Sequence, residues 1–141
     1  MEADVTIFEM GPRDGLQNES KFINTFEKIK LVNLLSKSGL SKIETASFVS
    51  SRWVPQMTDG EQVMDGIQRE PGISYTALTP NKRGLDRAIQ AKADEIAIFG
   101  SASEGFSKAN INKNVKESLQ LFKPIVDAAP MPVRGYVSCV T

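Results

Sequence analysis

The sequence lacks most features that mark secreted, membrane-bound or nucleic-acid-binding proteins. One cysteine among 141 residues forms no internal disulfide, which favours a reducing compartment. No apolar run approaches the roughly 18 residues that suggest a membrane span. Seventeen basic and seventeen acidic residues cancel, so no net charge attracts nucleic acid or an anionic membrane. The first ten residues, with two acids among the first four, resemble neither a signal nor a transit peptide. These absences predict a soluble, cytoplasmic protein that binds neither nucleic acid nor membranes.

What the sequence does contain is an alternation of short apolar segments with helical ones. The predicted strands are 5–9, 42–48, 74–78, 95–99 and 133–139. Several of them lack polar alternation, as expected of a parallel sheet buried on both faces. Strand–helix alternation of this kind predicts a parallel α/β fold.

Four helices are predicted between these strands. The first opens at Asn24 with Glu27 as a capping partner and ends near Gly39, and the others open near residues 58–59, after Asn81 and after Asn114. Apolar side chains at helical spacing mark the buried faces, with Phe26, Ile29, Val32 and Leu35 on the first helix and Val115, Leu119, Phe122 and Val126 on the fourth. Residues 100–113 are predicted to be a long polar loop, which either contributes to a ligand site or is merely solvated.

Two architectures fit five such units. A doubly wound sheet of the flavodoxin type would be complete at this length. A (β/α)8 TIM barrel needs about 250 residues, of which this chain would supply the first five strands. Periodicity alone favours the complete fold, and the motifs favour the barrel.

Arg13 and Asp14 form the first of these motifs, immediately after the first predicted strand. Barrel enzymes keep their active sites at the carboxyl ends of the strands. Arginine offers a forked, permanently charged donor for an oxyanion, and aspartate offers a hard oxygen ligand for a divalent cation. The alternative is a glycine-rich turn in which Arg13 makes a surface ion pair.

Glu44 is the second motif, because a carboxylate within an apolar strand is costly unless it is paired. Inside a barrel it would hydrogen-bond Arg13 or support a metal ligand. The alternative is an outward-facing glutamate.

Together these residues resemble the hydroxymethylglutaryl-CoA lyase family. The likeness covers almost the whole chain in the family's order, in the segments 11–19 (GPRDGLQNE), 43–45 (IET), 47–50 (SFVS), 53–57 (WVPQM), 78–81 (LTPN), 99–104 (FGSASE) and 134–139 (RGYVSC). The residues around Arg13 and Asp14 resemble the lyases rather than the isopropylmalate or homocitrate synthases. The resemblance implies a carbon–carbon lyase that cleaves (S)-3-hydroxy-3-methylglutaryl-CoA to acetyl-CoA and acetoacetate, as in leucine degradation and ketone-body metabolism.

The resemblance also assigns roles to individual residues. It implies that Arg13 and Glu44 are catalytic, that Asp14 binds Mg2+ or Mn2+, and that the substrate is a CoA thioester. Further substrate contacts are expected from Gln17, Arg134 and Tyr136, and contacts to the CoA nucleotide from Lys108 and Asn110. The intact protein is expected to form a homodimer.

The chain departs from the family in having no histidine. The family completes its metal shell with two histidines and an asparagine, and donates a proton from a cysteine, all beyond the fifth strand. Cys139 is not that cysteine and is predicted to be a small apolar filler. Residues 1–141 are therefore expected to be the N-terminal part of a single catalytic barrel domain, truncated after strand five. Such a fragment is expected to be inactive alone, and its two open edges invite aggregation. A non-catalytic half-barrel remains the alternative from another functional class.

Overall fold

The computed structural model describes residues 5–141. Residues 1–4 lie outside the described residues. They include the two acidic residues used above to argue that the N-terminus does not resemble a transit peptide. The elements in chain order are β1 (Phe8–Glu9), η1 (Gly11–Gly15), α1 (Thr25–Leu35), β2 (Lys42–Ser47), η2 (Pro55–Met57), α2 (Gly60–Gly66), β3 (Ser74–Leu78), α3 (Lys82–Gln90), β4 (Glu95–Ser101), α4 (Glu104–Ile111), α5 (Val115–Ala128) and β5 (Val133–Ser138).

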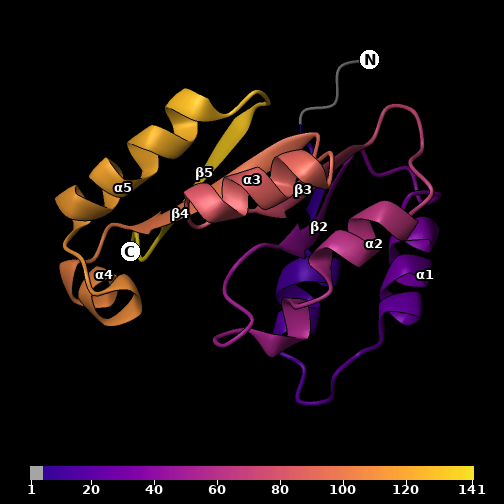
Figure 1. Cartoon of the computed structure of the whole chain (residues 1–141), viewed down its shortest axis with the longest axis horizontal. Coiled ribbons are helices and arrows are strands. Elements are labelled where there is room, and N and C mark those ends of the chain that lie inside the picture. Colours follow the sequence, from indigo (N-terminus) through magenta and orange to yellow (C-terminus); the bar gives the residue numbers. More distant parts are fainter. Residues whose placement is uncertain (1–4) are drawn as a thin grey trace.

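The strands form one parallel sheet whose spatial order is the chain order, β1-β2-β3-β4-β5. A doubly wound sheet would reverse direction at a switch point and so break this order. Sequential order with right-handed crossovers instead places the helices on one face, as in a barrel. The helices follow the sheet in chain order, from α1 and α2 at one end to α4 and α5 at the other (Figure 1). The barrel expectation is confirmed, and the doubly wound alternative is wrong.

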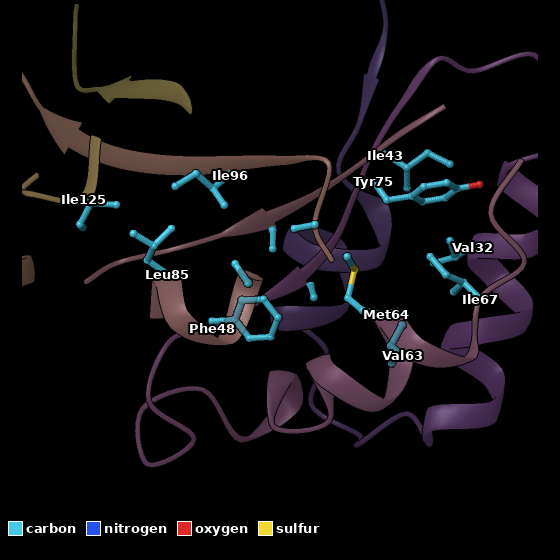
Figure 2. Packing of buried hydrophobic residues seen from close by; sticks show 14 of the residues in the cluster. Val32, Ile43, Phe48, Val63, Met64, Ile67, Tyr75, Leu85, Ile96 and Ile125 are labelled. Carbon is cyan, nitrogen blue, oxygen red and sulfur yellow. The ribbon is translucent and has the colours of Figure 1, made fainter. Parts of the chain in front are cut away.

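The hydrophobic core lies between the sheet and these helices. Strand residues Ile43, Tyr75 and Ile96 meet helical residues such as Met64 and Leu85, and all five are fully or almost fully buried (Figure 2). Burying a side chain of this size contributes roughly 1.5–3 kcal/mol. The core therefore covers the convex face of the sheet.

Alternate residues of each strand point to opposite faces, so the residues between the core positions line the concave face, and several of them are polar. Glu44 is in register with Thr76, and Thr76 with Glu95, while Phe99 is in register with Tyr136. In a flat sheet β2 and β5 would lie about 14 Å apart, at three strand spacings. The Tyr136 hydroxyl nevertheless donates a hydrogen bond to Glu44 across this face. The sheet is therefore curved into half of a barrel.

Most predicted elements are confirmed, and the exceptions have physical causes. The 100–113 stretch is not a loop, since it contains α4, whose Ser103 side chain caps the helix by accepting from the Phe106 amide. On α5 the buried positions are Ser118, Phe122 and Ile125, while Leu119 and Val126 of the predicted stripe are exposed.

Two further side chains are more exposed than expected. Phe26, placed on the buried stripe of α1, is 71% exposed. Cys139 is exposed with a positive φ of 57°, so the prediction of an apolar filler is wrong. Trp53, the only tryptophan, lies on the segment that joins β2 to α2 and is 80% exposed. Within residues 5–141, no helix combines the length and the hydrophobicity needed to cross a membrane.

Candidate active site at the carboxyl ends of the strands

Arg13 and Asp14 lie in η1, one tight turn directly after β1. The Met10 carbonyl accepts from the amides of Arg13 (3.2 Å), Asp14 (2.7 Å) and Gly15 (3.3 Å). The bond from Gly15 joins residues five apart, which makes the turn a π-helix. Gly11 opens this turn, and its amide donates to Glu9 Oε1 at 2.6 Å. A Cβ at Gly11 would lie 2.8 Å from that oxygen, so a larger residue would push the end of the Glu9 side chain aside. Short π-helical turns occur often at functional sites.

Glu44 connects Arg13 to the opposite side of the half-barrel. Its side chain is fully buried, and that of Arg13 is 12% exposed. Arg13 Nε donates to Glu44 Oε1, and the Tyr136 hydroxyl donates to Oε2 at 2.6 Å. Arg13 Nη1 also donates to Asp14 Oδ1 at 2.8 Å. A continuous hydrogen-bonded chain thus runs from β5 through β2 to η1, and the alternatives of a surface arginine and an outward-facing glutamate are wrong.

Tyr136 is an uncharged hydrogen-bond donor to Glu44. Burial raises the pKa of its hydroxyl far above the ordinary value of 10, and the hydrogen bond to the Glu44 carboxylate raises it further. The phenol therefore stays protonated throughout the neutral range. Its hydroxyl also lies 3.8 Å from Met10 Sδ, which places it beside the start of η1.

Arg134 lies elsewhere, two residues before Tyr136 on the same strand. Its Nε donates to Glu95 Oε1 at 2.9 Å, and Lys42 Nζ binds the other Glu95 oxygen at 2.6 Å. Both cations also lie over the Phe8 ring, 4.3 Å and 5.8 Å from its centroid. Burial alone would raise the pKa of Glu95, but its bonds to Lys42 and Arg134 outweigh burial and lower that pKa. The structure therefore brings Tyr136 to Arg13 and Glu44 and does not bring Arg134 there.

The remaining predicted residues are less closely engaged. Gln17 follows η1, and its Oε1 is buried without a hydrogen-bond partner among the described residues. Lys108 and Asn110 are exposed on α4, near the C-terminal end of that helix. Neither contacts Arg13, Asp14 or Glu44 through any hydrogen bond in the described part of the chain.

Asp14 is the candidate metal ligand, with a side chain that is 57% exposed. Its carboxylate suits a hard divalent ion and stays accessible, although Oδ1 also accepts from Arg13. Across residues 5–141, no three acidic or cysteine side chains gather closely enough to bind a metal ion. The described residues thus offer a single candidate ligand for a divalent ion, Asp14.

Glu95 is a buried acid that sequence reasoning missed. It begins an apolar strand, so the argument that singled out Glu44 applied to it equally. Its position at the strand start made it resemble a boundary residue. Lys28 was missed as well, because a lysine on an amphipathic helix normally faces solvent, whereas here it is buried.

Comparison with known proteins agrees with this geometry. Residues 4–135 match the model of the HMGL-like family. The chain is 56% identical over 138 residues to the mouse protein "3-hydroxy-3-methylglutaryl-CoA lyase, cytoplasmic", with 96% of this chain and 40% of that protein covered. Other relatives are named as mitochondrial lyases.

Solved structures agree with these relatives. The HMG-CoA lyase of Brucella melitensis is 53% identical with a TM-score of 0.95, covering 97% of this chain and 50% of that one. An HMG-CoA lyase of Acinetobacter baumannii, in complex with coenzyme A and 3-methylmalate, is 39% identical with a TM-score of 0.90, covering 97% and 47%. The chain thus spans about half, or less, of these relatives. Its five parallel strands correspond to half of their TIM barrel, and the chain belongs to the HMGL-like family.

Proposed function

We propose that the intact protein cleaves (S)-3-hydroxy-3-methylglutaryl-CoA to acetyl-CoA and acetoacetate, as a carbon–carbon lyase. The observation that carries this proposal is the chain Tyr136–Glu44–Arg13–Asp14, which holds a guanidinium beside a carboxylate at the carboxyl ends of the strands. Residues 1–141 would form part of one catalytic barrel domain. The names of the relatives support the substrate.

Arg13 would stabilise the negative charge that collects on the thioester oxygen as the carbon–carbon bond breaks. Its Nε is bound to Glu44 and its Nη1 to Asp14, while Nη2 has no partner within residues 5–141. A fixed donor aimed at a developing oxyanion is typically worth about 2.7–4 kcal/mol. Glu44 would set the direction of the guanidinium, and Tyr136 would hold Glu44.

Asp14 would bind a divalent ion, for which we propose Mg2+ or Mn2+. Such an ion, when bound, would make the tertiary hydroxyl of the substrate easier to deprotonate. The exposed face of Asp14 supports this role, and the remaining ligands would come from outside the described residues.

The other predicted contacts belong to substrate binding. A CoA thioester is supported by the relative solved with coenzyme A. We propose that Gln17, with its unpartnered buried oxygen, contacts the acyl part, and that Lys108 and Asn110 on α4 contact the nucleotide. For Arg134 we now favour a role in holding Glu95, because that contact occupies its Nε.

The test is an assay of the intact protein with hydroxymethylglutaryl-CoA, compared with 2-oxo acids plus acetyl-CoA. We expect cleavage of the first and no condensation of the second. Condensation without cleavage would favour a synthase related to isopropylmalate or homocitrate synthase, and no turnover of either would favour a non-catalytic half-barrel.

The cellular setting forms a separate part of the proposal. We propose a homodimer in the cytoplasm, acting in leucine degradation or ketone-body metabolism. The exposed free thiol of Cys139 suits a reducing compartment, although relatives include cytoplasmic and mitochondrial forms. Cell fractionation tests the compartment, and light scattering during gel filtration tests the dimer.

A further inference from the structure

Lys28 is a buried cation that the proposed chemistry does not use. It lies on α1 and is 3% exposed. Its Nζ donates to Asp59 Oδ1 at 2.6 Å and to the Gln56 carbonyl, and it lies 4.6 Å from the centroid of the Phe22 ring. Burying an ammonium group is costly unless it is paired in this way. Because burying Lys28 carries this cost, its contacts indicate a structural role rather than that of a solvated surface charge.

Asp59 joins Lys28 to the start of α2. It is the residue before that helix and is buried. Its second oxygen, Oδ2, accepts from Thr25 Oγ1 at 2.7 Å, in the first turn of α1. The pair therefore fixes the starts of α1 and α2 against each other, at the end of the fold where the strands finish.

Gln56 extends this contact to the segment that carries Arg13 and Asp14. Its Nε2 donates to the Glu19 carbonyl at 2.5 Å, while its own carbonyl accepts from Lys28. The Glu19 amide in turn donates to Leu16 at 3.2 Å. Closer to the site, Asn18 Nδ2 donates to the Asp14 carbonyl at 2.8 Å. Hydrogen bonds thus lead from buried Lys28 to Glu19, and the backbone from Glu19 to Asn18 continues the connection to the candidate metal ligand.

We propose that Lys28, Asp59 and Gln56 form a clamp that positions η1, and with it Arg13 and Asp14, relative to Glu44. β2 and the segment after it then hold η1 from two sides, because Glu44 of β2 binds the guanidinium while Gln56 holds the residues that follow η1. These are positioning residues, since none of the three contacts Arg13 or Asp14 directly. Their catalytic consequence rests on the function proposed above.

Two variants of the intact protein separate positioning from folding. Gln56→Met keeps the side-chain length, removes the donor to Glu19 and leaves the Lys28–Asp59 pair in place. The double variant Lys28→Met/Asp59→Asn removes both charges, so no unpaired charge remains buried. Lys123→Met is the control, because Lys123 forms an exposed ion pair with Asp127 on α5.

The measurements are hydrogen exchange of residues 11–19 and steady-state kinetics with hydroxymethylglutaryl-CoA. We expect these amides to exchange about tenfold faster in both test variants, because the local opening becomes easier. We expect kcat to fall by about tenfold to a hundredfold, as misplaced catalytic groups do, with a much smaller change in KM. The control should match the parent protein in both.

Unchanged exchange of residues 11–19 in folded variants would overturn the clamp. Faster exchange with unchanged kcat would overturn its positioning role. A parent protein that shows no lyase turnover would instead refute the proposed function, and the exchange data would still decide whether the clamp holds η1.

Discussion

At the scale of single residues, Arg13 carries the strongest prediction. Arg13→Gln removes the charged fork but leaves the Asp14 carboxylate accessible, so turnover of hydroxymethylglutaryl-CoA should fall by at least about a hundredfold while metal affinity is kept. Steady-state kinetics and metal titration of the intact protein test both halves. Lys123→Gln, which removes an exposed charge on α5, should leave both unchanged. Near-normal turnover in Arg13→Gln would defeat the assignment.

Tyr136 offers a milder test of the same chain. Tyr136→Phe removes one hydrogen bond to the Glu44 carboxylate, and bonds to charged groups contribute about 1.5–3 kcal/mol. If Glu44 directs Arg13, kcat should drop by about tenfold or more, because 1.4 kcal/mol corresponds to a factor of ten. A variant with unchanged kcat would show that Arg13 alone holds Glu44 in place.

Glu95 predicts how stability depends on pH. In the folded state the pKa of Glu95 lies below its ordinary value of 4.5. The stability that Glu95 contributes is therefore present above the unfolded-state pKa, and it is lost as the pH falls through the folded-state pKa. Glu95→Gln should cost about 1–3 kcal/mol at pH 7. Urea unfolding should show this difference shrinking below about pH 4.5. Exposed Asp86→Asn provides the comparison, and a pH-independent cost for Glu95→Gln would contradict the ion-pair account.

At the scale of elements, α5 begins with a complete capping box. Asn114 Oδ1 accepts from the Glu117 amide at 2.8 Å, and the Glu117 side chain accepts from the Asn114 amide at 2.9 Å. Asn114→Ala should destabilise the protein by about 1 kcal/mol, measured by thermal unfolding. Gln120→Ala, at an exposed position within the same helix, should have little effect, and an equal loss from both variants would argue against capping.

Sequence patterns predicted the elements better than their buried faces. Strand 74–78 and the cap at Asn24 agree with the structure, because apolar runs and capping pairs are local signals. Leu119 was placed on the wrong side of α5, since helical spacing does not say which stripe meets the sheet.

In the candidate site, too, some features could be predicted from the sequence and others could not. The strand position of Glu44 predicted its burial, whereas its bond to Tyr136 spans 92 residues and depends on the curvature of the sheet.

At the scale of the whole molecule, the sheet has two unpaired edges among the described residues. β1 pairs only with β2, and β5 only with β4. Open edges expose backbone donors and acceptors to other chains. Residues 1–141 produced alone should therefore associate in light scattering and show no turnover. Adding the complementary half of the Brucella melitensis relative should reduce association. A monomeric, active preparation of residues 1–141 would contradict this prediction.

The position of Trp53 has a practical consequence for such experiments. Its indole is already solvated in the folded chain, so unfolding changes its surroundings little. Tryptophan emission from residues 1–141 should hardly register denaturation, and circular dichroism is the better signal for following it. Conversely, a ligand that binds the segment between β2 and α2 would shield the Trp53 indole from solvent. Reduced quenching of its emission by iodide would therefore detect such binding without an added label.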